Sequence, residues 1–318
     1  MAPTTLGIDA QYRALREEAG LLDRSERARI AVTGSEAGEF LQGQLTNDVE
    51  ALEPGAGCYA ALLDRKGRVR ADMRVLRVDD ATFLIDTEPD AAAVVLSHLS
   101  MYKIGRDAEV AAAEGDDALL SLIGPRAEQI VGAPLGREHS HREVKIDGVV
   151  CRAIATDLGA DLIVPADGRD AVEAALQRAG AEAVGPEAAE IARVESGRPR
   201  LGREIEPERT MPQEAGINDR AVSFTKGCYI GQETVARLHY KGKPNRHLRR
   251  LRSTEPLAAG AGVTLDGREL GTVGTAVLSP ANGPLALAVL RREAEPGAEV
   301  EIAGGGTATV EAIEGDEV

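Results

Sequence analysis

The chain has few of the residues that often stabilise small proteins, namely aromatic residues and cysteines. It has no tryptophan, aromatic residues make up 3% of its 318 residues, and it contains only three cysteines. Cys58, Cys151 and Cys228 lie far apart and form no C-x-x-C pair, which excludes a disulfide framework and a zinc site of the usual spacing. Because 43% of the residues are hydrophobic, a sizeable core has to form from aliphatic side chains.

Positive charge is scarce as well. The chain carries 37 basic and 52 acidic residues, a formal net charge of −15, which argues against broad non-specific binding to nucleic acid, and DNA is not an expected partner. The longest apolar runs, such as residues 91–96, are far shorter than the roughly 18 residues of a membrane span. The N-terminal segment MAPTTLGIDAQYRALREEAG lacks the basic and apolar regions of a secretory leader. We therefore expect a cytoplasmic protein without membrane contact.

Several common catalytic motifs are also missing. No P-loop, no G-x-S-x-G and no H-E-x-x-H occurs, and no G-x-G-x-x-G follows a predicted strand. His139 and His141 are the one close pair of histidines. They would share a face of an extended segment, as two metal ligands could, but without a third ligand nearby a solvated loop is the simpler interpretation, and we expect no metal.

The hydrophobic pattern predicts a mixed α+β protein. Ser35 has the residue type of a helix N-cap. Strands are expected at 29–33, 57–63, 68–78 and 82–86, and helices at 35–44, 89–100, 170–179 and 186–196.

One local pattern occurs twice. The segments 30–41 and 120–131 each read as an apolar strand, a glycine and a helix, with Gly34 matching Gly124. This predicts two similar α+β halves, although two ordinary units could also share such a pattern by chance. From about Leu248 the chain changes to short, glycine-rich β segments, and Asp266-Gly267 is a hairpin signal. A small β-barrel or sandwich is expected there.

Cys228 follows Lys226 and Gly227. A nearby ammonium stabilises a thiolate, and a glycine lets another group approach, so one interpretation is an activated thiol. The alternative is a small buried hydrophobe, which is where most free cysteines lie, and spacing alone favours it. Cys58 and Cys151 stand in apolar segments and are expected in the core.

Two carboxylates are further candidates. Strand alternation places Asp72 on one face with Arg70 and Arg74. The simpler interpretation is a surface ion-pair ladder, and the functional one is an ionised carboxylate that binds or steers a protonated amine. Glu195 lies near a predicted helix end. It could accept two parallel N–H groups from a pterin or guanine ring, or it could pair with Arg198 on the surface.

A basic run without acids follows the Cys228 segment. It is either a solvated face or a binding site for a polycarboxylate, a phosphate or an RNA backbone. Its members are Lys241, Lys243, Arg246, Arg249, Arg250 and Arg252.

The block KGCYIGQE at 226–233 resembles the signature of the YgfZ-type folate-binding proteins. These belong to the superfamily of the glycine-cleavage T-protein, an aminomethyltransferase. The resemblance extends over most of the chain. Further similar segments are VTGSEAGEFLQGQLTNDV at 32–49, LLDRKGRVRADMRV at 62–75, MYKI at 101–104 and ARVESGRPRLGREI at 192–205.

This resemblance implies a T-protein-like α+β fold of three parts around a central opening that binds tetrahydrofolate. The expected division is a folate-binding aminomethyltransferase-like region at 1–244, made of two α+β units at roughly 1–115 and 116–244, and a C-terminal β-barrel at 245–318.

The resemblance also implies roles for single residues. Glu195 matches the glutamate that holds the pterin ring, and Asp72 matches the aspartate near the reacting folate nitrogen. Cys228 matches the cysteine that marks the YgfZ-type branch. Further folate contacts are expected from Arg198, Lys226, Tyr229 and Gln232, and the basic run would suit the glutamate tail of a folate.

The expected function is a tetrahydrofolate-binding protein that supports iron–sulfur cluster assembly or repair, with iron–sulfur proteins as clients and indirect effects on tRNA modification. The alternative is a folate-dependent aminomethyl or one-carbon transferase that uses Asp72. RNA binding is the weakest hypothesis, because aromatic residues for base stacking are sparse near the basic run: Phe224, Tyr229 and Tyr240.

Overall fold

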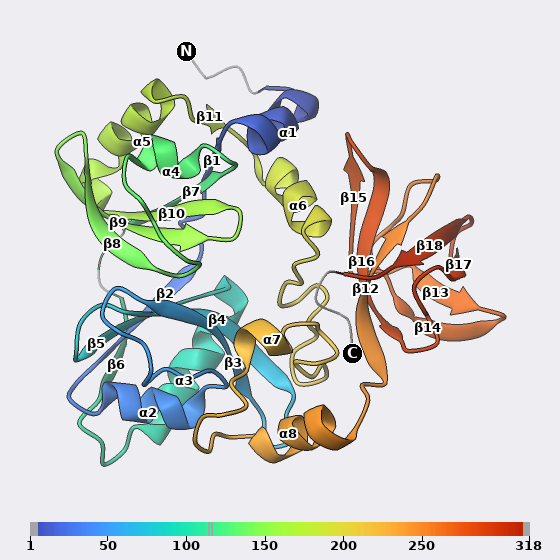
Figure 1. The fold of residues 1–318 in the computed structure, drawn as a ribbon, viewed down its shortest axis with the longest axis horizontal. Helices are drawn as coiled ribbons and strands as arrows, with labels where there is room; N and C mark the ends of the chain where they lie inside the picture. Colours follow the sequence, from blue (N-terminus) through green and yellow to red (C-terminus); the bar gives the residue numbers. More distant parts are fainter. Residues whose placement is uncertain (1–5, 114, 116, 314–318) are drawn as a thin grey trace. The chain divides into compact units, whose positions relative to one another are not determined.

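The computed structural model describes residues 6–113, 115 and 117–313 (Figure 1). Residues 1–5, 114, 116 and 314–318 lie outside this part. They include the start of the first predicted domain range and the end of the last one. The chain forms two compact units. The first comprises residues 1–60 and 72–189, and the second comprises residues 61–71 and 190–318. The predicted boundaries near 115 and 244 stay predictions.

The first unit contains a five-stranded antiparallel sheet in the order β3-β4-β5-β2-β6. On β4 the alternating residues Val69, Ala71, Met73 and Val75 are all buried, so the predicted core face of this strand is confirmed. The strands are β2 (Ala28–Thr33), β3 (Gly57–Leu63), β4 (Val69–Arg77), β5 (Thr82–Thr87) and β6 (Glu109–Ala112). The tip of the β3–β4 hairpin, residues 61–71, groups with the second unit.

The second sheet of this unit has six strands in the order β11-β1-β7-β10-β9-β8. Its β1 comes from the N-terminal part of the chain, so the two sheets are not built from two consecutive halves. The strands are β1 (Gly20–Asp23), β7 (Ala118–Ile123), β8 (His141–Ile146), β9 (Val149–Thr156), β10 (Gly159–Val164) and β11 (Glu182–Ala183). Aliphatic residues such as Leu122, Ala153 and Leu162 form its core.

The predicted repeat of strand, glycine and helix is confirmed. Gly34 follows β2 with φ +133°, and Gly124 follows β7 with φ +136°. A Cβ at Gly34 would lie 2.2 Å from the carbonyl oxygen of Asp107, and one at Gly124 would lie 2.6 Å from that of Glu18. Any other residue would therefore be strained at both turns and would also clash with a backbone.

The helices of this unit differ from the sequence predictions at their starts. Ser35 does not cap α2 (Ala37–Gln44); its hydroxyl instead donates to Asp107 at 2.5 Å. The helix predicted from Pro89 begins as a 3-10 turn, Pro89–Ala91, and continues as α3 (Ala92–Tyr102). The remaining helices are α1 (Ile8–Glu17), α4 (Ala127–Val131) and α5 (Arg169–Arg178).

The second unit is dominated by a seven-stranded antiparallel sheet in the order β14-β13-β17-β18-β12-β16-β15. The sheet curls into a half-barrel and not a closed barrel: within residues 117–313 its edge strands β14 and β15 do not pair. Asp266 and Gly267 have φ +50° and +74° and join β13 to β14, which confirms the predicted hairpin. The strands are β12 (Arg246–Arg252), β13 (Gly262–Leu265), β14 (Arg268–Thr272), β15 (Thr275–Ser279), β16 (Gly283–Arg291), β17 (Glu299–Ile302) and β18 (Thr307–Glu311).

Three helices precede this sheet. They are α6 (Pro186–Glu195), whose first residues group with the first unit, α7 (Asn218–Ala221) and α8 (Gln232–Lys241). Across residues 6–113, 115 and 117–313, every helix is too short or too polar to cross a bilayer.

Candidate functional site

Asp72 lies on β4 of the first unit, and Tyr59 lies on the neighbouring strand β3. The Tyr59 hydroxyl donates to Asp72 Oδ2 at 2.5 Å, and the Thr87 hydroxyl donates to the Asp72 carbonyl oxygen at 2.6 Å. Burial raises the pKa of the Asp72 carboxyl above its usual value, although the Tyr59 hydrogen bond and the charge of Arg27 act in the opposite direction. Asp72 is therefore a positioned carboxyl group that takes up a proton more readily than an ordinary aspartate.

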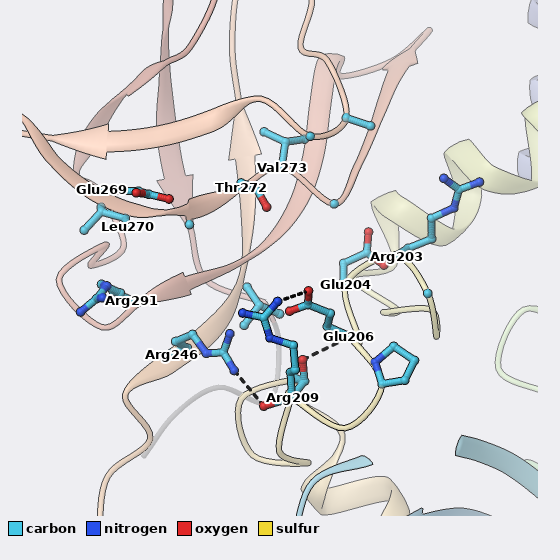
Figure 2. Close-up of a pocket in the computed structure, with 18 residues that line it drawn as sticks. Arg203, Glu204, Glu206, Arg209, Arg246, Glu269, Leu270, Thr272, Val273 and Arg291 are labelled. Atoms are coloured by element: carbon cyan, nitrogen blue, oxygen red, sulfur yellow. Dashed lines mark hydrogen bonds and ion pairs between the residues drawn. The ribbon is translucent and has the colours of Figure 1, made fainter. Parts of the chain in front are cut away.

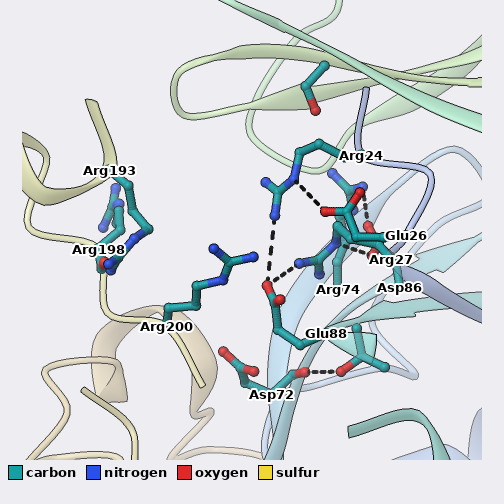
Figure 3. A network of polar contacts seen from close by, with 12 residues as sticks. Arg24, Glu26, Arg27, Asp72, Arg74, Asp86, Glu88, Arg193, Arg198 and Arg200 are labelled. Atoms are coloured by element: carbon teal, nitrogen blue, oxygen red, sulfur yellow. Dashed lines mark hydrogen bonds and ion pairs between the residues drawn. The ribbon is translucent and has the colours of Figure 1, made fainter. Parts of the chain in front are cut away.

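An arginine–carboxylate network of the first unit adjoins this group (Figure 3). Arg27 binds Asp86 at 2.6 Å and Glu88 at 2.5 Å. Arg74 binds Asp86 as well and reaches Asp161 at 2.7 Å. Burial works against ionisation of Asp86, but the two arginines outweigh it and hold the pKa of Asp86 at about 2. Asp86 is thus a permanent anion at neutral pH.

These contacts correct the predicted ion-pair ladder on β4. Arg74 pairs with Asp86 and Asp161, and Arg70 pairs with Glu208 at 3.3 Å. The side chain of Asp72 is instead held by Tyr59. Asp72 is therefore not part of a surface ladder, and its functional role stays a prediction.

Glu195 is the last residue of α6 in the second unit. Its Oε1 accepts hydrogen bonds from the Ser279 hydroxyl at 2.5 Å and from Asn282 Nδ2 at 2.9 Å. Arg250 Nη1 donates to the Glu195 carbonyl oxygen at 3.0 Å. The connection between β15 and β16 therefore fixes the orientation of this carboxylate, which suits a group that accepts N–H donors from a flat heterocycle.

Arg198 follows α6 in the same unit and is half-buried. Its carbonyl oxygen accepts a hydrogen bond from Arg193 Nη1 at 2.5 Å. Arg193 also binds Glu190 at 2.7 Å and Glu204 at 3.0 Å. The turn after Glu195 is therefore tied down by a network of its own.

Cys228 is exposed, which corrects the expectation from its spacing. Its segment runs into Gly231, which has φ +86°. A Cβ at Gly231 would lie 2.5 Å from the carbonyl oxygen of Asp64. The glycine therefore lets this segment approach the tip of the β3–β4 hairpin, and the thiol remains open to solvent.

Lys226 and Tyr229 are both 8% exposed. The Lys226 ammonium lies 5.0 Å from the centre of the Tyr229 ring, within cation–π range, and burial raises the pKa of Tyr229 to about 12. Gln232 begins α8 and is half-buried, and its backbone N–H donates to the Tyr229 carbonyl oxygen at 3.3 Å. The predicted residues Lys226, Tyr229 and Gln232 thus belong to one local cluster with Cys228.

The basic run is divided by the fold. Arg250 and Arg252 both pair with Glu311, at 2.7 and 2.5 Å, and buried Arg249 donates to the Ala294 carbonyl oxygen at 3.2 Å. Strand β12 sends these side chains to alternate faces, so they do not form one anion site. Lys241 and Lys243 remain exposed.

The histidines and remaining cysteines have structural environments. His141 is 4% exposed at the start of β8, not in a solvated loop. Burial and the nearby charge of Arg152 lower the pKa of His141 to about 4. Among the described residues, no cluster of histidine, cysteine and acidic side chains could hold a metal ion. Cys151 is buried with its pKa raised to about 11, as expected for a core thiol, whereas Cys58 is only half-buried.

Sequence reasoning missed three residues that hold the candidate carboxylates. Tyr59 could have been found, because it lies in the strand predicted to pair with the strand of Asp72. Ser279 and Asn282 lie 84 and 87 residues beyond Glu195 in the chain. No local signal links them to it.

Comparison with known proteins places the chain in a family. The model of the GCVT N-terminal domain matches residues 2–226. The chain belongs to this family. It is 31% identical over 300 residues to a probable aminomethyltransferase of Halobacterium salinarum, an alignment that covers 87% of this chain and 80% of the relative.

Two further relatives agree with this family. The chain is 29% identical to a putative chloroplastic transferase of Arabidopsis thaliana, and the match covers 79% of this chain and 60% of that relative's length. In structure it resembles the glycine cleavage system aminomethyltransferase T from Bartonella henselae, with a TM-score of 0.86 and 25% identity over 98% of this chain and 90% of that one. The predicted T-protein-like α+β fold is confirmed, and the YgfZ-type branch stays a prediction.

Proposed function

We propose that the protein binds tetrahydrofolate and transfers an aminomethyl or other one-carbon group with it, using Asp72 as the acid–base residue. The main support for this proposal is the Asp72 carboxyl group, which accepts a hydrogen bond from Tyr59 and has a raised pKa. The relatives of the chain include an aminomethyltransferase and a probable aminomethyltransferase, which supports the reaction class.

The chemistry needs a group that handles a proton on an amine nitrogen. As a carboxylate, Asp72 attracts and orients a protonated amine, and as a carboxylic acid it returns the proton. Because its pKa is raised, Asp72 changes between carboxylate and carboxylic acid at a pH closer to neutral than an ordinary aspartate does. The Tyr59 hydroxyl fixes one carboxyl oxygen of Asp72, and the other is the proposed contact with the substrate.

Glu195 is the proposed anchor of the folate ring. Its carboxylate is held on one oxygen by Ser279 and Asn282, so it does not need to be ordered when the ligand arrives. A fixed carboxylate suits the adjacent N–H and amino groups of a pterin. Arg198, Lys226, Tyr229 and Gln232 are proposed as further contacts.

The test of turnover uses tetrahydrofolate with a lipoyl-bound aminomethyl donor, whose carbon passes to the folate as ammonia and the dihydrolipoyl thiol are released. We expect formation of methylene-tetrahydrofolate, reduced by about 10²–10⁴-fold in Asp72→Asn, as for loss of a general acid–base group. Unchanged reduced-folate binding in that variant serves as the control. Equal turnover in the variant and the wild type would remove Asp72 from the mechanism.

The test of binding is calorimetric titration with a reduced folate. We expect a clear signal for the wild type and its loss in Glu195→Ala, while Glu187→Ala at an exposed position of the same helix serves as the comparison. If Glu195→Ala binds as the wild type does, the pterin does not contact this residue.

The exposure of Cys228 favours a second candidate function. Here the folate-bound protein supports assembly or repair of iron–sulfur clusters in client proteins, and Cys228 is its working thiol. Cys228→Ser should keep folate binding but fail to restore the activity of an iron–sulfur enzyme, whereas Cys58→Ser should restore it. Full activity of Cys228→Ser would exclude the thiol role.

A further inference from the structure

A cavity of about 770 Å³ lies within the second unit, between the segment 202–210 and the strands of the half-barrel (Figure 2). This volume is typical of small-molecule sites. Neither Glu195 nor Cys228 is among its lining residues. Of the basic run that was expected to suit a folate tail, Arg246 alone is among the lining residues, and the lining includes neither the proposed pterin anchor nor the thiol.

The charge of the lining is opposite in sign to that of the chain. The lining contains four arginines and three glutamates, whereas the chain has 37 basic and 52 acidic residues. Glu204 pairs with Arg193 at 3.0 Å and Arg246 pairs with Glu214 at 2.9 Å; neither Arg193 nor Glu214 lines the cavity, so the two pairs offset each other. The four arginines are Arg203, Arg209, Arg246 and Arg291.

Two of these arginines stand directly opposite each other. Arg246 on β12 and Arg291 on β16 are cross-strand partners. Like charges at such positions destabilise a sheet. Arg291 forms no ion pair with any described residue, so this pair is incompletely neutralised by the protein.

Arg246 is oriented and retains a donor. Its Nε and Nη2 bind the Glu214 carboxylate at 3.0 and 2.9 Å, and Nη2 also donates to the Arg209 carbonyl oxygen at 3.1 Å. Its Nη1 donates to none of the residues that the structure describes. The guanidinium is thus held in place with one edge available to a ligand.

The segment 202–210 supplies the third cation. Arg209 lines the cavity (Figure 2), and its guanidinium binds Glu206 at 2.8 Å. Glu269 on β14 is the remaining acidic lining residue. The lining therefore includes arginines from a loop and from two strands, and planar guanidinium groups suit phosphate and carboxylate oxygens.

We propose that this cavity is a second ligand site, which binds a small anionic metabolite through phosphate or carboxylate groups placed between Arg246 and Arg291. The anion replaces the carboxylate that Arg291 lacks and relieves the repulsion across β12 and β16. Arg209 adds a further donor from the loop. Binding at this site does not require folate.

The experiment titrates the full chain with pyrophosphate or citrate at constant ionic strength, followed by calorimetry and thermal unfolding. We expect saturable binding of at least one anion. Arg291→Ala should weaken it about tenfold, since a charge-assisted hydrogen bond is worth about 1.5 kcal/mol or more. Thr272→Glu, which adds a negative charge to the lining, should weaken it similarly. Preference for pyrophosphate identifies a phosphate ligand, and preference for citrate identifies a carboxylate ligand.

Arg268→Ala is the matched control, because Arg268 lies on the same sheet, pairs with Glu293 at 3.5 Å and does not line the cavity. It should bind both anions as the wild type does. Reduced-folate binding should be unchanged in Arg291→Ala, which separates this site from the proposed function. Absence of saturable binding with both anions, or equal affinities in Arg291→Ala and Arg268→Ala, would overturn the proposal.

Discussion

Asp72 and Asp86 lie on the adjacent strands β4 and β5 of one sheet, yet their acidities move in opposite directions. The pKa of Asp72 is raised by burial, while Arg27 and Arg74 hold that of Asp86 at about 2. Burial removes water from both carboxyl groups. Their pKa values differ because their partners differ in charge. Asp86 contacts two guanidinium groups, and Asp72 contacts the neutral hydroxyl of Tyr59. Partner charge therefore separates a structural carboxylate from one suited to proton transfer.

The largest expected effect on stability is that of Asp86→Asn. Removing this carboxylate takes away one of the two ion-pair partners of Arg27 and of Arg74, and breaking a buried ion pair typically costs about 3–5 kcal/mol. Denaturant unfolding measures the change. A loss below about 1 kcal/mol would show that Glu88 and Asp161 satisfy the two arginines without Asp86.

The pH dependence of unfolding should follow the same contrast. Because the folded pKa of Asp86, about 2, lies below the unfolded value near 3.9, its contribution is present above pH ~4 and disappears as pH falls toward 2. It amounts to roughly 2 kcal/mol. The raised pKa of Asp72 has the opposite sign, so its contribution is lost as pH rises through that pKa. Unfolding measured against pH in wild type and Asp86→Asn should show a smaller acid loss in the variant.

The variant Tyr59→Phe tests the surroundings of Asp72, the other carboxyl group in the comparison. Losing this hydrogen bond should cost about 1 kcal/mol. Because the Tyr59 bond lowers the pKa of Asp72, its removal should raise that pKa further. The acid limb of the pH profile for turnover should therefore move to higher pH. An unmoved profile would show that Asp72 does not control that limb.

The smallest expected effect is that of Asp72→Asn on stability. The amide keeps the shape and removes a partly buried charge, so the free energy of unfolding should change by less than about 1 kcal/mol. Thermal unfolding checks this. A loss as large as that of Asp86→Asn would mean that Asp72 is a structural carboxylate too.

Local sequence patterns predict many of the strands, helices and turns. The partners of the candidate site residues depend on contacts between distant parts of the chain. The alternation on β4, the paired Gly34 and Gly124 turns and the Asp266-Gly267 hairpin follow from short-range sterics. The partners of the arginines on β12 depend on β16, β18 and distant loops, and spacing could not show them. Cys228 was assigned to the core by the general behaviour of free thiols, but its loop leaves it exposed.

The hydrogen bonds from Ser279 and Asn282 to Glu195 have a consequence for the synthesis of the chain. When the ribosome has released α6, the two residues that orient its terminal glutamate have not yet been made, because they come 84 and 87 residues later. A nascent or C-terminally truncated chain therefore carries an unoriented Glu195. Only a chain that has been translated and folded through Asn282 can therefore present the proposed pterin anchor in its final orientation.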